Sequence, residues 1–294
     1  MAGSLAGRVV LITGAARGIG AETARIAARR GALLSLVGLE PQRLQALAEE
    51  LGPGHAWFAC DVTDQAAVDR AIAGTVAALG GIDVVVANAG ISNNGTVAAN
   101  PVEALTRTVD VNVNGVIRTV SAALPHLTGR KGYILIVSSA AALSAFPGIA
   151  AYSASKIAVE HFGGSLRMEL AHKGVQVGVA HPSWIDTDLV RDQRVELGAF
   201  DLMRQKMPWP YNTVLPVETC AAALVDAIEH RKRKIHVPEF LAVVEAFRPF
   251  FMGPLWEAIV SLEARHAIPQ FEAELEALGR AFGRTSAGMG GKRD

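Results

Sequence analysis

Short apolar runs alternate with longer stretches of helical spacing through the first two thirds of the chain. A strand that is apolar at nearly every position is buried on both faces, which is typical of a parallel sheet covered by helices on both sides. The predicted strands are residues 8–13, 33–37, 56–60, 82–87, 132–137, 175–180 and 235–237. The pattern therefore predicts an α/β fold, a doubly wound parallel sheet with right-handed crossovers, known as the Rossmann fold.

The pattern changes in the last third of the chain. Residues 186–216 contain several prolines and no periodicity, which predicts a long loop with a short helix, a common form for lids and binding loops. After residue 238, apolar positions recur at helical spacing. We therefore expect a catalytic domain at 1–238, a helical C-terminal extension at 239–284 and a disordered tail at 285–294. The extension is expected to pack on the loop or on a neighbouring subunit, with shallow insertion into a membrane surface as the alternative.

Composition narrows the class of protein. Among 294 residues, 28 Lys and Arg balance 28 Asp and Glu, so bulk charge gives no reason to expect a nucleic-acid partner. The basic run at 231–234 is interpreted as a solvated helix end. The two cysteines suggest neither a disulfide framework nor a metal site, and no metal is expected. Because a strand begins by residue 8 and no apolar stretch is long enough to span a bilayer, we expect a cytoplasmic protein.

A glycine-rich turn, residues 13–20, joins the first strand to the first helix. Glycines there allow a tight turn and a close approach to a diphosphate, whose charge the helix N-terminus attracts. Where such folds usually carry an acid that holds the adenosine ribose, the second strand ends in Gly38, and Glu40 follows two residues later. Without the acid, Arg17 would be able to neutralise a 2′-phosphate. The sequence therefore favours NADP over NAD, unless Glu40 reaches back to the ribose.

Two further strand ends are candidates for cofactor contact. Asp61 follows the third strand, where its carboxylate could meet the adenine or cap the next helix. Asn88, Ala89 and Gly90 follow the fourth strand, either as space for a cofactor or as an ordinary turn.

Tyr152 and Lys156 are one turn apart on a predicted helix. A tyrosine has a pKa of roughly 10, and a neighbouring cation lowers it, so Tyr152 is a candidate general acid/base. Ser139 ends the fifth strand at the carboxyl edge of the sheet, where such folds bind ligands. Asn112 lies among apolar neighbours and is either functional or a structural amide link between helices.

With these motifs in this order, residues 5–238 resemble the single-domain short-chain dehydrogenase/reductase family. The resemblance implies a nicotinamide-dependent oxidoreductase that interconverts an alcohol and a carbonyl group. Tyr152 would move the proton on the substrate oxygen, Lys156 would lower its pKa and bind the ribose, Ser139 would stabilise the developing alkoxide, and Asn112 would hold a relay water. The implied cofactor-binding residues are Gly14, Arg17, Gly18, Ile19, Gly20, Gly38, Asp61, Val62, Asn88, Ala89, Gly90, Tyr152, Lys156, Pro182, Ile185 and Thr187.

The chain departs from the family pattern after the sixth strand, where Ser183 replaces a glycine next to Pro182. The resemblance also implies a homodimer or homotetramer built on the helices of Asn112 and Tyr152. The competing interpretation is a regulator that binds NADP(H) and senses the redox ratio without turnover.

Residues 143–149 and the loop at 186–216 are expected to line an apolar substrate pocket. A bulky alcohol or ketone, such as a steroid, terpenoid or lipid, would suit it, although Met and aromatic residues are often plain core. The predicted substrate-binding residues are Ser139, Phe146, Tyr152, Trp184, Met203 and Met207, with Trp209 nearby.

Overall fold

The computed structural model describes residues 5–93, 95–207 and 209–283, so the tail predicted at 285–294 lies outside the described residues. A parallel sheet of seven strands in the order β3-β2-β1-β4-β5-β6-β7 forms the centre of the molecule. The strands are β1 (Val9–Thr13), β2 (Leu33–Gly38), β3 (Ala56–Ala59), β4 (Val84–Ala87), β5 (Tyr133–Val137), β6 (Gln176–Pro182) and β7 (Lys234–Val237). The predicted doubly wound parallel sheet is confirmed, and the predicted strand bounds differ from the observed ones by at most two residues at either end.

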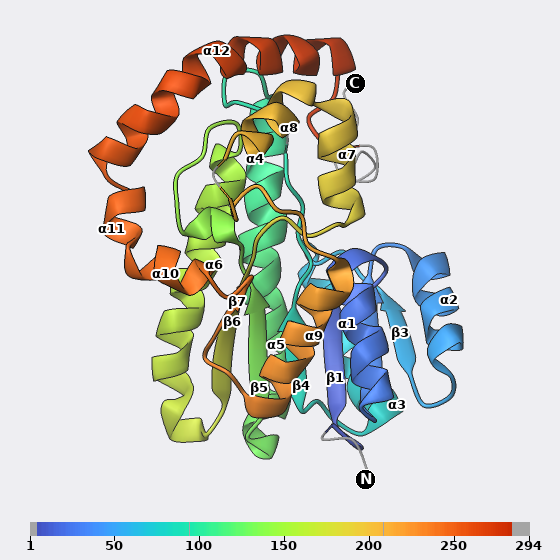
Figure 1. Ribbon diagram of the computed structural model, residues 1–294. Helices are drawn as coiled ribbons and strands as arrows, with labels where there is room; N and C mark the ends of the chain where they lie inside the picture. Colours follow the sequence, from blue (N-terminus) through green and yellow to red (C-terminus); the bar gives the residue numbers. More distant parts are fainter. Residues whose placement is uncertain (1–4, 94, 208, 284–294) are drawn as a thin grey trace.

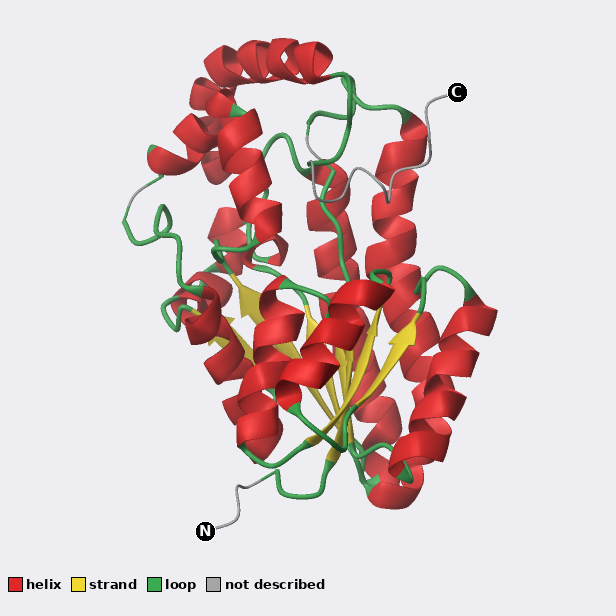
Figure 2. Cartoon of the chain, turned by 90° about the vertical axis from the view of Figure 1, so that its right-hand side faces the viewer, coloured by secondary structure: helices red, strands yellow, loops and turns green. Residues whose placement is uncertain are grey.

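Helices cover both faces of the sheet (Figure 2). Successive residues of β1 point to opposite faces, so that Val10 and Ile12 join one buried apolar cluster and Leu11 joins the other. The first cluster includes α1 (Gly18–Arg29), α2 (Pro41–Leu51) and α9 (Val217–His230). The second includes α3 (Gln65–Leu79), α5 (Gly115–Arg130) and α6 (Ala150–Leu170). This burial on both sides explains why the strands are apolar at nearly every position.

Two segments differ from the sequence prediction. The region expected to be a long loop with one short helix contains two helices, α7 (Asp188–Glu196) and α8 (Gly198–Gln205). The helix expected to carry Asn112 is divided into α4 (Val102–Val109), a π-helical turn η1 (Asp110–Asn114) and then α5. The extra residue of a π-turn is frequently found at functional sites, and Asn112 lies in this one.

The chain after β7 forms α10 (Leu241–Ala246), α11 (Arg248–Phe251) and the long α12 (Pro254–Leu278). Figure 1 shows this extension, in orange and red, crossing beyond the carboxyl ends of the strands. Phe271 of α12 is fully buried and stacks on Phe200 of α8, with ring centroids 5.5 Å apart. The extension therefore packs on the region expected to bind substrate. Within the described residues, no helix has the length and apolar character needed to cross a bilayer.

Candidate active site

A cleft of about 300 Å³ opens at the carboxyl edge of the sheet. Its wall combines the turn after β1, the ends of β2 to β6, the start of α6, and parts of α7, α8 and α10. Ligands of open α/β sheets bind at this edge, because the loops leaving the strands diverge there.

The glycine-rich turn forms one end of the cleft. Gly14 and Gly18 have left-handed backbones, with φ of +67° and +56°, and both line the cleft with Arg17 and Ile19. A Cβ on Gly14 would lie 2.9 Å from the Ala89 Cα atom, so only glycine fits between the two segments.

Gly20 is the third residue of α1 and lies behind this turn, outside the cleft wall. A Cβ on Gly20 would lie 2.3 Å from the Gly14 carbonyl oxygen, so this glycine allows the turn to close. Asn88 donates from Nδ2 to the same oxygen at 3.3 Å and to the Thr13 carbonyl at 3.0 Å. A bare backbone turn at a helix N-terminus fits the diphosphate of a dinucleotide.

The end of β2 leaves space around Gly38 and carries both positive and negative side chains nearby. A Cβ on Gly38 would come no closer than 3.6 Å to a neighbour, the Leu44 side chain. Glu40 lines the cleft, 3.5 Å from the Arg17 guanidinium and 3.7 Å from that of Arg43. The cation predicted to meet a 2′-phosphate is therefore already shared with a carboxylate.

Asp61 also lines the cleft, and its carboxylate is held by protein donors. It accepts hydrogen bonds from the Thr63 backbone at 2.9 Å, the Thr63 hydroxyl at 2.7 Å and Arg107 Nη2 at 2.9 Å. Burial opposes ionisation, but these bonds outweigh it and keep the pKa of Asp61 below its usual value. The helix cap considered for this segment falls on Asp64, which accepts from the Ala66 backbone at the start of α3.

Tyr152, Lys156 and Ser139 meet in the cleft wall. The Lys156 Nζ lies 5.6 Å from the centroid of the Tyr152 ring and donates to the Val137 carbonyl at 3.0 Å. Burial lowers the pKa of Lys156 to about 8. Burial raises the pKa of Tyr152, and a hydrogen bond with Ser139 opposes this shift. The hydroxyl, phenol and amine predicted to act together thus lie together.

Asn112 is fully buried and lies outside the cleft wall. Its carboxamide accepts from the Ile91 backbone at 2.8 Å and donates to the Ile91 carbonyl and to the Ser155 hydroxyl, each at 2.9 Å. These contacts tie the segment after β4 to α6, which carries Tyr152 and Lys156. The side chain of Asn112 therefore forms a structural amide link, as the alternative interpretation expected. The relay water stays a prediction.

The other predicted cofactor residues also line the cleft: Val62, Ala89, Gly90, Pro182, Ile185 and Thr187. Ser183, which replaces the family glycine, lines it too and donates its backbone N–H to the Val237 carbonyl at 2.8 Å. The substitution therefore leaves this backbone hydrogen-bonded to β7.

The predicted substrate residues divide into two groups. Phe146, Trp184 and Met207 line the cleft. Met203 is instead buried in the cluster of Phe200 and Phe271 behind the wall, and Trp209 is 82% exposed, so both expectations are corrected. Apolar character alone does not show which face of α8 points to the cleft.

Gln193, Phe200 and Tyr211 also line the cleft and lie within the predicted binding loop at 186–216. Several other wall residues were not predicted from the sequence: Ser92, Arg107, Leu241 and Val244. Two of these, Leu241 and Val244, belong to α10 in the extension. Their helical spacing was visible in the sequence, but the side of the molecule on which they pack was not.

Comparisons with known proteins agree with this geometry. Residues 8–197 match the family model described as short chain dehydrogenase. The chain is 34% identical over 207 residues to an uncharacterized oxidoreductase of Listeria innocua, covering 67% of this chain and 84% of that protein. It is 36% identical over 192 residues to a glycine betaine reductase of Emericella nidulans, covering 64% of this chain but only 15% of that longer protein.

Among solved structures, a short chain dehydrogenase/reductase from Burkholderia phymatum in complex with NAD is similar, with a TM-score of 0.72. The two chains are 25% identical, and the match covers 82% of this chain and 92% of that one. The similarity thus extends over most of both chains.

Proposed function

The chain belongs to the short chain dehydrogenase family and is an oxidoreductase of that type, and on this premise we propose that it interconverts a secondary alcohol and a ketone. The observation that carries the proposal is the convergence of Ser139, Tyr152 and Lys156 in the cleft that begins at the glycine-rich turn. A nicotinamide cofactor, when bound, supplies the hydride acceptor or donor, and the protein supplies binding, orientation and proton transfer.

Each residue of the site has a separate proposed role, set by its position in the cleft. Tyr152 transfers the proton at the substrate oxygen. Lys156, in its cationic form, favours the phenolate of Tyr152 and holds the cofactor ribose. Ser139 donates a hydrogen bond to the same substrate oxygen, which stabilises negative charge developing there. Gly14, Gly18 and the neighbouring backbone hold the diphosphate.

Replacing Tyr152 by Phe tests this assignment. The variant keeps the ring and loses the proton donor, so turnover should fall at least about a thousandfold while binding of reduced cofactor, followed by its fluorescence, persists. Full activity of the variant would refute the mechanism. A wild-type protein that binds the cofactor but oxidises or reduces nothing in a broad panel would favour the redox-sensing regulator instead.

The proposed cofactor is NADP(H). Two features support it: Arg17 can neutralise a 2′-phosphate, and Gly38 stands where a carboxylate would repel one. Glu40, which pairs with Arg17, opposes it. Parallel titrations with NADPH and NADH test the preference. Removal of the Glu40 charge, in Glu40→Gln, should tighten NADPH by about tenfold and change NADH little. Tighter binding of NADH by the wild type would reverse the proposal.

The proposed substrate is bulky and apolar, of steroid, terpenoid or lipid type. The aromatic side chains Phe146, Trp184, Phe200 and Tyr211 in the cleft wall support this class. A panel of secondary alcohols and ketones tests it, with kcat/KM expected to rise with apolar size. A small polyol as the best substrate would reject this class and leave the reaction type standing.

We further propose a cytoplasmic homodimer or homotetramer. Val109 and Ile117, on the helices that flank Asn112, are 38% and 39% exposed and would be covered in such an assembly. Light scattering coupled to size exclusion gives the molar mass. A monomer at micromolar concentration would exclude the assembly.

A further inference from the structure

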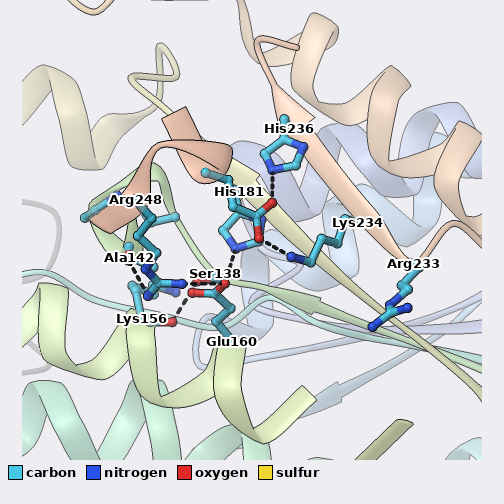
Figure 3. Close-up of polar contacts among 12 residues, drawn as sticks. Ser138, Ala142, Lys156, Glu160, His181, Arg233, Lys234, His236 and Arg248 are labelled. Atoms are coloured by element: carbon cyan, nitrogen blue, oxygen red, sulfur yellow. Dashed lines mark hydrogen bonds and ion pairs between the residues drawn. The ribbon is translucent and has the colours of Figure 1, made fainter. Parts of the chain in front are cut away.

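The C-terminal extension is joined to the catalytic elements by charged groups (Figure 3). Arg248, the first residue of α11, donates from Nη1 to Glu160 Oε1 at 3.0 Å and from Nη2 to the Ala142 carbonyl at 2.8 Å. Glu160 lies one helical turn after Lys156 on α6, and Ala142 ends the short 3-10 helix (Ala140–Ala142) that follows Ser139. One guanidinium therefore contacts both segments that carry the proposed catalytic groups.

A second contact fixes the same part of the extension. Glu245 of α10 pairs with Lys234 and with Nε2 of His236 on β7, the latter at 2.9 Å. The His236 ring stacks on the fully buried His181, with centroids 5.3 Å apart, and His181 Nε2 lies 3.7 Å from Glu160 Oε1. Charged and titratable groups thus continue from β7 across β6 to the catalytic helix, as Figure 3 shows.

Glu160 is the centre of this arrangement. Its side chain is 12% exposed. Burial opposes its ionisation, but His181 and Arg248 outweigh that effect and keep the pKa of Glu160 below its usual value. The titratable and charged groups that face it are His181 from β6 and Arg248 from α11, with His236 and Glu245 beyond His181. On its own helix, Lys156 lies one turn before it. Arg248 is the guanidinium partner of Glu160.

We propose that Arg248 is a positioning residue of the reaction, which holds the Ser139 segment against the helix of Tyr152 and Lys156 and neutralises Glu160, one helical turn from Lys156. The C-terminal extension thereby helps to set the proton affinity of the Tyr152–Lys156 pair. This inference rests on the proposed function, since it assigns Arg248 an effect on those two groups.

Replacing Arg248 by Met leaves the Glu160 carboxylate without its permanent cation. The negative charge then favours the protonated forms of Lys156 and Tyr152. The limb of the pH profile of kcat that reports the ionisation of this pair should therefore move to higher pH by about half a unit to one unit. Loss of the Ala142 contact should lower kcat by about tenfold. Hydrogen exchange of the amides at 140–143, measured without cofactor, should accelerate.

Three variants separate charge from packing. Arg248→Lys keeps the charge, so the limb should stay where it is in the wild type. Glu160→Gln removes the negative charge and should move the limb downward. Glu160→Gln combined with Arg248→Met removes both charges and should return the limb close to its original position, with kcat still low. Arg30→Met is the matched control, because it breaks a 3.2 Å pair with Glu229 at the far end of α1 and should change neither limb nor exchange.

The proposal is overturned if Arg248→Met leaves the limb in place, or if the double variant keeps the shift of the single one. Should Arg248→Met fail to fold, the downward shift in Glu160→Gln still decides the question, and an unmoved limb refutes the proposal. Failure of the proposed function looks different, since full activity of Tyr152→Phe would remove the limb's assignment whatever Arg248 does.

Discussion

At the scale of single residues, the site contains a buried charged group, the ammonium of Lys156, whose burial costs stability. Lys156 is 5% exposed, and besides its bond to the Val137 carbonyl its ammonium faces the Tyr152 ring. Its pKa of about 8 means that the folded protein binds this proton less tightly than the unfolded chain does. The lysine therefore opposes folding at neutral pH, as functional groups often do.

Lys156→Met should accordingly be more stable than the wild type at pH 7. A depression from 10.5 to about 8 corresponds to about 3 kcal/mol, reduced by roughly 1 kcal/mol for the lost hydrogen bond. The unfolded chain binds the additional proton between these two pKa values, so wild-type stability rises with pH across that window and the advantage of the variant disappears above it. Urea unfolding at pH 7, 9 and 10.5 measures this; an advantage that does not vary with pH would contradict it.

The glycine-rich turn gives a second prediction at this scale. A methyl group at Gly20 would lie 2.3 Å from the Gly14 carbonyl and distort the turn, so Gly20→Ala should weaken cofactor binding by at least about a hundredfold. Gly129 in α5 has no neighbour within 4 Å, which makes Gly129→Ala the matched control. Fluorescence titration compares the two variants, and equal affinities would show that the turn does not hold the cofactor.

At the scale of elements, the strands could be predicted from the sequence because both of their faces are buried. Each strand was recognisable because it is apolar throughout, as in β1 and β5. One short helix was predicted between residues 186 and 216, where the fold has both α7 and α8. Helix α7 is hard to recognise because it buries only Val190 and Gln193, and ion pairs such as Arg191–Asp186 accompany it at its start. A helix with so few buried positions has no visible period.

The position of an element is harder to predict than its existence. Helical spacing in the extension indicated α12, but only the fold brings Phe271 against Phe200. The same limit explains why Met203 was expected in the cleft and lies behind it.

Phe271→Ala tests the role of α12. The ring is fully buried, so its removal should lower the free energy of unfolding by about 3–5 kcal/mol. Because Phe200 would lose its stacking partner, KM for an apolar substrate should also rise. Ile259→Ala, on an exposed part of the same helix, is the control and should change both little. Thermal and urea unfolding measure the difference, and equal stability of the two variants would contradict the packing.

At the scale of the whole molecule, the sheet and the extension form one functional unit. The sheet supplies the glycine-rich turn and the groups on α6, while α10 supplies Leu241 and Val244 to the cleft wall. A chain ending at Pro238 should therefore melt at a lower temperature than the full chain and lose turnover of an apolar substrate. Calorimetry and the substrate assay measure both, and unchanged turnover would show that the extension is dispensable.

This arrangement has a consequence for biosynthesis. Translation delivers the sheet and its nucleotide turn first, and domains generally begin to fold from the N-terminal side as they emerge. Arg248 and the residues of α10 emerge from the ribosome only after the whole sheet, yet they contact the segment after Ser139 and the helix of Lys156. A nascent or prematurely terminated chain would hence carry the proposed catalytic side chains in an unfinished cleft, and oxidoreductase chemistry would begin only in polypeptides that have been translated through the extension.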